Sequence, residues 1–91
     1  MDIGSIASGN ITVTGGGGGN GQVDIKRTSG AEIRIQAQSS LAKFGAVTNN
    51  HLQFMTNDTG RWNIENGGHL IPVADSSYDI GSNGTRVRNL Y

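Results

Sequence analysis

Apolar residues alternate with polar ones in short pairs along most of the chain. In a β-strand the side chains at positions i and i+2 point to the same side, so each pair predicts a strand with one apolar face. The pairs are Ile11 and Val13, Val23 and Ile25, Ile33 and Ile35, Leu52 and Phe54, Trp62 and Ile64, Ile71 and Val73, and Tyr78 and Ile80. The pattern predicts short strands centred near residues 12, 24, 34, 53, 63, 72 and 79.

Glycine and asparagine cluster between these pairs. Both residues tolerate positive φ, so the clusters predict turns. They lie at Gly15–Gly19 with Asn20-Gly21, and at Ser29-Gly30, Asn49-Asn50, Asn57–Gly60, Asn66–Gly68 and Asn83-Gly84. Short strands separated by turns every roughly eight to twelve residues are typical of a sandwich, a barrel or a β-solenoid. The predicted fold class is therefore all-β.

One longer gap, from Gln36 to Thr48, leaves two interpretations open. Ala37, Leu41, Ala42 and Phe44 could form a helical turn with Ser39 or Ser40 as its N-cap. Gly45 would limit such a helix to about one turn. The second interpretation is irregular or extended chain.

The five consecutive glycines, Gly15–Gly19, divide the chain into parts. Such a run has no side chains to bury and a high backbone entropy, which is typical of a flexible joint. We expect an N-terminal docking arm at 1–14, a Gly-rich hinge at 15–21 and a β-rich body at 22–91. The arm's large apolar residues, Ile3, Ile6, Ile11 and Val13, are the expected docking contacts. A frayed tail or an ordinary first strand is the alternative.

The composition is poor in the residues that build a core. Leu, Ile, Val and Phe number 20 among 91 residues, whereas there are 15 Gly, one Pro and no Cys. Small proteins with little core gain stability from disulfides, metals or oligomerisation. The lack of Cys excludes disulfides, and two isolated His residues make a poor zinc site. Oligomerisation is the reinforcement that remains.

Charge and hydropathy exclude several classes of partner. The formal net charge is zero, so the chain lacks the basic footprint that binds nucleic acid or an anionic membrane. The apolar runs are far too short for a membrane span, and the N-terminus does not resemble a signal peptide. We therefore expect a protein made in a cytoplasm, without nucleic-acid binding or membrane insertion.

Candidate catalytic patterns have simpler explanations. Gly16–Gly21 matches a dinucleotide fingerprint, but Gln22–Lys26 is predicted as a strand, not as the helix that would hold the pyrophosphate. The acidic residues lie in turn-like or solvated contexts, and neither His51 nor His69 has a nucleophile in a recognisable elbow. We expect no enzymatic activity and no cofactor. Trp62 and Tyr78 are either sugar-stacking platforms or, as we expect, packing residues.

In the C-terminal part, residues 52–91, Leu52–Ile64 combines a strand, a turn and a second strand, and Asn66–Pro72 adds a glycine turn and a further strand. These segments resemble the repeat in the stalk of bacteriophage tail fibres and tailspikes. Asp79–Tyr91 (DIGSNGTRVRNLY) carries the most specific similarity. It resembles the stretch that lies just upstream of the endosialidase-type intramolecular chaperone. That family continues into further stalk and the chaperone beyond the position of Tyr91.

The resemblance implies an elongated homotrimeric fibre of short intertwined β-strands, similar to a triple β-helix or a β-prism. Three chains would share one core, which would also supply the burial that a single chain lacks. We expect the shared core to contain the apolar residues of the C-terminal part, namely Leu52, Phe54, Trp62, Ile64, Tyr78, Ile80, Val87 and Leu90.

The expected function is a non-enzymatic virion component, a short tail fibre for host adhesion. Its partners would be its own copies and, through the arm, a baseplate, tail or capsid protein. A second candidate is a receptor-binding tip whose exposed turn residues, Asn57, Asp58, Asn66 and His69, contact host-surface glycan. Two more candidates are a capsid head fibre or decoration protein and, more distantly, a polysaccharide depolymerase.

Overall fold

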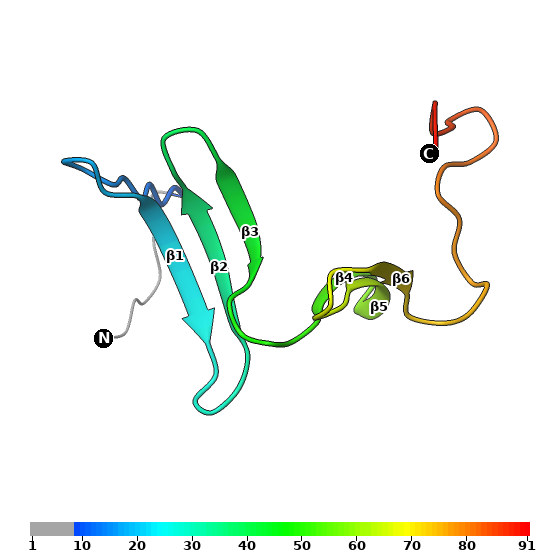
Figure 1. Cartoon of the computed structure of the whole chain (residues 1–91), viewed down its shortest axis with the longest axis horizontal. Helices are drawn as coiled ribbons and strands as arrows, with labels where there is room; N and C mark the ends of the chain where they lie inside the picture. Colours follow the sequence, from blue (N-terminus) through cyan, green and yellow to red (C-terminus); the bar gives the residue numbers. More distant parts are fainter. Residues whose placement is uncertain (1–8) are drawn as a thin grey trace. The chain divides into compact units, whose positions relative to one another are not determined.

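The computed structural model describes residues 9–91, which contain six short strands in two separate sheets (Figure 1). The chain divides into two compact units, Met1–Thr48 and Asn49–Tyr91, each with one three-stranded antiparallel sheet. The prediction of an all-β fold is confirmed, and no helix occurs among residues 9–91.

The first sheet is a meander of β1 (Gly21–Lys26), β2 (Glu32–Ala37) and β3 (Ala42–Ala46), with β2 in the centre. The β1–β2 turn is closed by hydrogen bonds between Arg27 and Ala31 and between Arg27 and Gly30, with Ser29 at φ 55°. A second turn is closed where the Gln38 N–H donates to the Leu41 carbonyl, 2.8 Å away. These turns set a register that places Val23, Ile35 and Phe44 side by side across the sheet.

The second sheet is a meander of β4 (Leu52–Thr56), β5 (Thr59–Ile64) and β6 (Leu70–Pro72), with β5 in the centre. Asn57 and Asp58 form the two-residue β4–β5 turn, both at positive φ (52° and 54°). Two central residues with positive φ match the twist of a hairpin, which explains Asn and Asp at these positions. A bulge at Phe54/Met55 shifts the register of β4 against β5.

The strand predictions near 24, 34, 53, 63 and 72 are confirmed, and three segments differ from or refine the sequence pattern. The gap between the predicted strands, from Gln36 to Thr48, contains β3, so extended chain and not a helical turn occupies 42–46. No strand forms near residues 12 and 79 within the described chain. Around 79 the backbone instead contributes Tyr78, Asp79 and Ile80 to one side of the second sheet. An isolated Ser82–Thr85 bridge follows.

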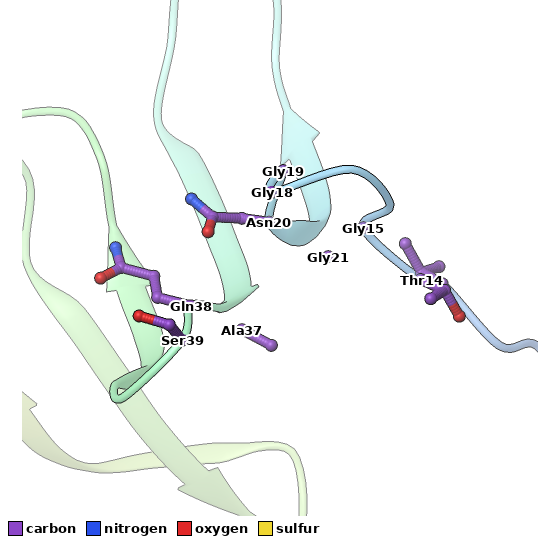
Figure 2. Close-up of a pocket in the computed structure, with 10 residues that line it drawn as sticks. Thr14, Gly15, Gly18, Gly19, Asn20, Gly21, Ala37, Gln38 and Ser39 are labelled. Carbon is purple, nitrogen blue, oxygen red and sulfur yellow. The ribbon is translucent and has the colours of Figure 1, made fainter.

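The glycine run folds into a tight turn, drawn in Figure 2 beside the end of β2. The Gly19 N–H donates to the Gly16 carbonyl at 3.0 Å, and Gly17 and Gly18 both have positive φ. A Cβ on Gly15 would lie 2.3 Å from backbone atoms of Gly19 and Asn20, so the chain doubles back closely there. The run therefore has a defined backbone path, and its role as a hinge stays a prediction.

Neither sheet encloses an apolar core. Among residues 9–91 no hydrophobic side chain is buried, and the most buried residue is the polar Gln36 at 9% exposure. Eighteen large hydrophobic residues are exposed in the described chain. A folded monomer normally covers one face of each sheet, so these sheets have apolar surface that a single layer does not bury.

Candidate functional site

The predicted core residues of β4 and β5 gather on one face of the second sheet. Leu52 pairs with Ile64 and Phe54 with Trp62, and residues two apart on a strand share a face. Leu70 and Pro72 of β6 extend the same row, because they pair with Ile64 and Trp62. Four of the eight predicted core residues therefore form one continuous apolar face.

Tyr78 joins this face from the segment after β6. Its ring centroid lies 6.4 Å from that of Trp62, and the two rings are tilted by 45°. The Arg61 guanidinium lies 5.4 Å from the Tyr78 ring centroid, and its Nη1 donates to the Tyr78 hydroxyl at 3.2 Å. Both contacts are favourable for a partly buried tyrosine. Arg61 thus ties the C-terminal segment to the second sheet.

The next predicted core residue, Ile80, lines an open cavity of about 340 Å³ together with Phe54, Trp62, Leu70 and Asp79. The side chains of Phe54 and Ile80 remain 44% and 57% exposed. Apart from the Asp79 carboxylate, the walls are apolar side chains. The cavity therefore suits an apolar group better than a charged one.

The last two predicted core residues lie farther along the chain. Val87 lines a separate hollow with Ile80 and the Gly81–Asn83 turn, whereas Leu90 is 85% exposed. The second unit thus brings six of the eight residues to one face of its sheet. Val87 and Leu90 lie on the segment beyond it.

The four candidate receptor contacts do not form one cluster within the second unit. Asn57 and Asp58 lie in the β4–β5 turn, whereas Asn66 and His69 lie in the β5–β6 turn. The two turns are at opposite ends of β5, whose six residues span about 20 Å. All four are exposed. Asn66 is held by a 3.1 Å bond from its N–H to His51 Nδ1 and by a 3.2 Å bond to Asn49.

The expected docking arm is described only in part. Ile3 and Ile6 lie outside the described residues. Ile11 and Val13 lie in chain without regular structure and are 69% and 49% exposed. Their docking role stays a prediction.

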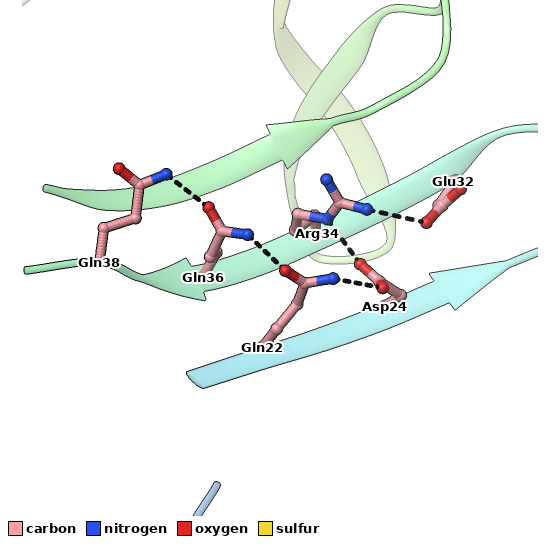
Figure 3. Close-up of polar contacts among 6 residues, drawn as sticks. All are labelled: Gln22, Asp24, Glu32, Arg34, Gln36 and Gln38. Atoms are coloured by element: carbon pink, nitrogen blue, oxygen red, sulfur yellow. Dashed lines mark hydrogen bonds and ion pairs between the residues drawn. The ribbon is translucent and has the colours of Figure 1, made fainter. Parts of the chain in front are cut away.

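Sequence reasoning missed a polar network on one face of the first sheet (Figure 3). Gln38 donates to Gln36, Gln36 to Gln22, and Gln22 to Asp24. Arg34 Nε donates to the other Asp24 carboxylate oxygen at 2.8 Å, and the Arg34 guanidinium lies 3.7 Å from Glu32. The polar positions that alternate with the apolar pairs of β1 and β2 were the available signal. The pairing register, which is not local, was needed to join them.

The charged groups of this network have a structural role. The hydrogen bond from Arg34, followed by that from Gln22, holds the pKa of Asp24 below its ordinary value. The same carboxylate raises the pKa of Arg34. Both groups keep their charges at neutral pH, so neither is suited to transfer a proton there.

The described residues offer no clustered ligands for a metal. No group of three or more His, Cys, Asp or Glu side chains that could hold an ion occurs in the part of the chain that the structure describes. Over the same residues, no helix is long and apolar enough to cross a membrane.

The comparisons add no family. No protein-family description, no curated protein and no solved structure matches this chain. Over residues 9–91 the protein is a small all-β chain of two antiparallel sheets with exposed apolar faces.

Proposed function

We propose that this chain is a non-enzymatic structural component of a phage virion, a short homotrimeric tail fibre that serves host adhesion. One observation carries the proposal: two regular sheets form, yet no hydrophobic side chain in residues 9–91 is buried. A chain of this kind needs further copies to cover its apolar faces. The similarity of Asp79–Tyr91 to fibre stalks supplies the virion context.

In the proposed trimer, the apolar face around Trp62 meets the same face of two further chains about one axis. Short sheets with open edges are well suited to this arrangement, because neighbouring chains can pair with the edge strands and cover the apolar faces. The strands would intertwine as in a triple β-helix or a β-prism. The N-terminal arm would attach the fibre to a baseplate, tail or capsid protein after synthesis in the host cytoplasm.

Sedimentation equilibrium of the purified full chain tests the assembly. The expected mass is three times that of the 9.5 kDa chain. A stable monomer would overturn the proposal. Mass spectrometry of purified particles then tests the virion role, with a copy number that is a multiple of three as the expected result.

A receptor-binding tip is the second candidate, favoured by the exposed β4–β5 hairpin turn. The β4–β5 turn places the polar residues Asn57 and Asp58 at the end of the hairpin, where both are exposed. A trimer would present three such turns. Weak single contacts with glycan would gain from this multivalency. Glycan-array binding that is lost in Asn57→Ala but retained in Asn83→Ala would favour the tip. No binding to any glycan would leave an attachment or spacer role.

A capsid head fibre or decoration protein is compatible with the same architecture. Immunogold labelling of intact particles separates the two locations. Label at the tail supports the tail fibre, and label on the head supports the head fibre.

A further inference from the structure

The first sheet has one entirely apolar face. The register places its residues in three rows across β1, β2 and β3. The small row is Gly21, Ala37 and Ala42, the middle row is Val23, Ile35 and Phe44, and the far row is Ile25, Ile33 and Ala46. Strict alternation keeps every charged residue of these strands on the opposite face. We call the surface made by the three rows the first apolar face.

The chain that precedes β1 crosses this face at the small row. Gly21 shares a face with Val23, so a Cβ on Gly21 would point toward the first apolar face. Such a Cβ would lie 3.0 Å from the Val13 carbonyl oxygen and 3.5 Å from the nitrogen of Gly15, the neighbour labelled in Figure 2. The backbone of residues 13–15 therefore passes over Gly21, where the missing side chain leaves room for it.

The glycine run brings the chain to this place. The bond from the Gly19 N–H to the Gly16 carbonyl closes a turn, and a Cβ on Gly15 would meet backbone atoms on the far side of that turn. The segment before the turn therefore runs back beside the start of β1. A cavity of about 620 Å³ lies there, with Val13, Thr14, Gly21 and Ala37 among its lining residues. The space between the segment and the small row is thus only partly filled.

The sequence of the segment suits an apolar surface. In extended chain Ile11 and Val13 lie on one side, whereas Asn10, Thr12 and Thr14 lie on the other. Residues 9–22 contain no charged side chain. Residues two apart in extended chain are separated by about 6.6 Å, which is also the spacing of successive rows of the sheet. With Val13 at the small row, Ile11 is therefore within reach of the middle row.

The structure shows this contact only at the small row. Ile11 is 69% exposed, and Ile35 and Phe44 of the middle row are 47% and 55% exposed. Bringing Ile11 onto the middle row would remove apolar surface of both from water, which the hydrophobic effect favours. Residues 13–15 are already at the sheet, so closing orders only the few residues before them.

We propose that residues 9–15 form a strap that closes over the first apolar face, with Val13 on the small row and Ile11 on the middle row. The strap belongs to the same chain as the sheet, so it depends neither on the number of copies nor on a virion role. The expected trimer core lies in the second sheet, so the strap does not compete with it.

Under the proposed function the strap has a regulatory consequence. Ile11 and Val13 are also the expected docking contacts of the arm. A closed strap holds them against the sheet, so a virion protein must bind them more strongly than the sheet does. Docking of the arm would then open the first apolar face. This consequence rests on the proposed function, whereas the strap itself does not.

Because the chain contains no cysteine, a single introduced thiol can report on the strap. Val23→Cys places the thiol in the middle row, and its reaction rate with a maleimide is measured in the full-length chain with and without Ile11→Ser. Thr12→Ala, on the other side of the same segment, is the matched control. Lys43→Cys, on the polar face, reports whether the sheet stays folded. Sedimentation gives the assembly state of every sample.

We expect Ile11→Ser to raise the rate at Val23→Cys about tenfold, because the closed strap loses the burial of an isoleucine. Thr12→Ala should leave this rate unchanged, and Lys43→Cys should react alike in all backgrounds. An unchanged rate in Ile11→Ser would overturn the inference. An increase found only where the assembly has also dissociated would overturn it too, because another copy would then be the cover. Protection that needs Ile11 in a monomeric chain would support the strap and remove the proposed trimer.

A measurement on the wild-type chain decides the case in which Ile11→Ser also exposes the Lys43→Cys thiol. Methyl NOEs from Ile11 to Val23 or Ile35 are expected within one chain. A sample that mixes differently labelled chains separates these from contacts between copies. Absence of the NOEs, or NOEs only between copies, would overturn the strap.

Discussion

The two sheets share a topology but differ in how their apolar faces are treated. Each is a three-stranded antiparallel meander with its middle strand in the centre. In the second unit, Tyr78 and Ile80 return to the apolar face, and Arg61 holds Tyr78 there. In the first unit nothing comparable returns among the described residues, so Ile25, Ile35 and Phe44 stay exposed. In this chain, the apolar face that gains partial cover is the one with an anchoring contact, that of Arg61 with Tyr78.

The polar sides differ as well. The first sheet has a continuous network of amide and ionic contacts from Gln38 to Glu32. On this side the second has a separate contact between Gln53 and Asn63, whereas Arg61 bonds Thr56, which shares the face of Phe54. The first sheet is thus regular on both faces, whereas the second combines a bulge with an aromatic cluster. Four changes to the chain or its solvent test these differences, the largest expected effect first.

Replacing Trp62 by Ala should have the largest effect. In the proposed trimer Trp62 lies at the centre of the shared core, and truncating a buried aromatic costs about 3–5 kcal/mol. We expect the assembly to dissociate or unfold, measured by sedimentation and thermal melting. Gln53→Ala, on the opposite face of the same sheet, is the matched control. A Trp62→Ala chain that assembles and melts like the wild type would remove Trp62 from the core.

Replacing Gly15 by Ala tests whether the glycine run is a packed turn in the first unit. A Cβ there would lie 2.3 Å from backbone atoms, whereas one on Gly16 would meet nothing within 4 Å. We expect Gly15→Ala to cost about 1–3 kcal/mol, a typical penalty for a steric conflict. Hydrogen exchange at Gly19 and Gly21 should report the loss of the turn. Gly16→Ala is the control, and equal exchange in both variants would instead favour the flexible hinge.

Replacing Tyr78 by Phe should remove the anchor of the second unit while keeping its ring. The hydroxyl accepts a 3.2 Å hydrogen bond from Arg61, and such bonds contribute about 1 kcal/mol when partly exposed. We expect a small decrease in melting temperature. Tyr91→Phe, at a fully exposed tyrosine, should leave melting unchanged. If both variants melt alike, the Arg61 contact does not stabilise this unit.

Acid should affect the first sheet through Asp24, with the smallest effect of the four. The contact with Arg34 lowers the pKa of Asp24 in the folded chain. The resulting stabilisation is therefore present above the ordinary carboxylate pKa and is lost as pH falls through the folded value. We expect part of the acid dependence of melting below about pH 4 to vanish in Asp24→Asn. Arg34→Gln should reduce the same dependence, and an unchanged profile in both variants would contradict this assignment.

The strand positions were largely predictable, because alternation is a local property. Val23 with Ile25 and Trp62 with Ile64 each mark a strand that the structure contains. Ala42–Ala46 was not predicted as a strand, since Phe44 is its only large apolar residue and its extension depends on pairing with β2. Tyr78 and Ile80 alternate like a strand but contact the side of the second sheet instead. Their alternation therefore reflects contact with one side of the sheet, and such contact does not require strand pairing.

The candidate sites were predictable to a lesser degree. The apolar face with Leu52, Phe54, Trp62 and Ile64 follows from alternation on two adjacent strands. By contrast, two features depend on where the chain turns. One is the separation of Asn57 from Asn66 by the length of β5, and the other is the contact between Arg61 and Tyr78. The network around Asp24 and Arg34 depends on a register between residues ten positions apart.

The sequence by itself determined that this chain is all-β, with Gly and Asn at its turns, and that it has too few apolar residues for an ordinary core. These properties follow from side-chain periodicity and composition, which act within a few residues. Only the tertiary structure decided which strands pair, which face each side chain occupies, and that the first sheet leaves its apolar side open. Those features arise from hydrogen-bond registers and packing between distant segments, which local periodicity does not specify.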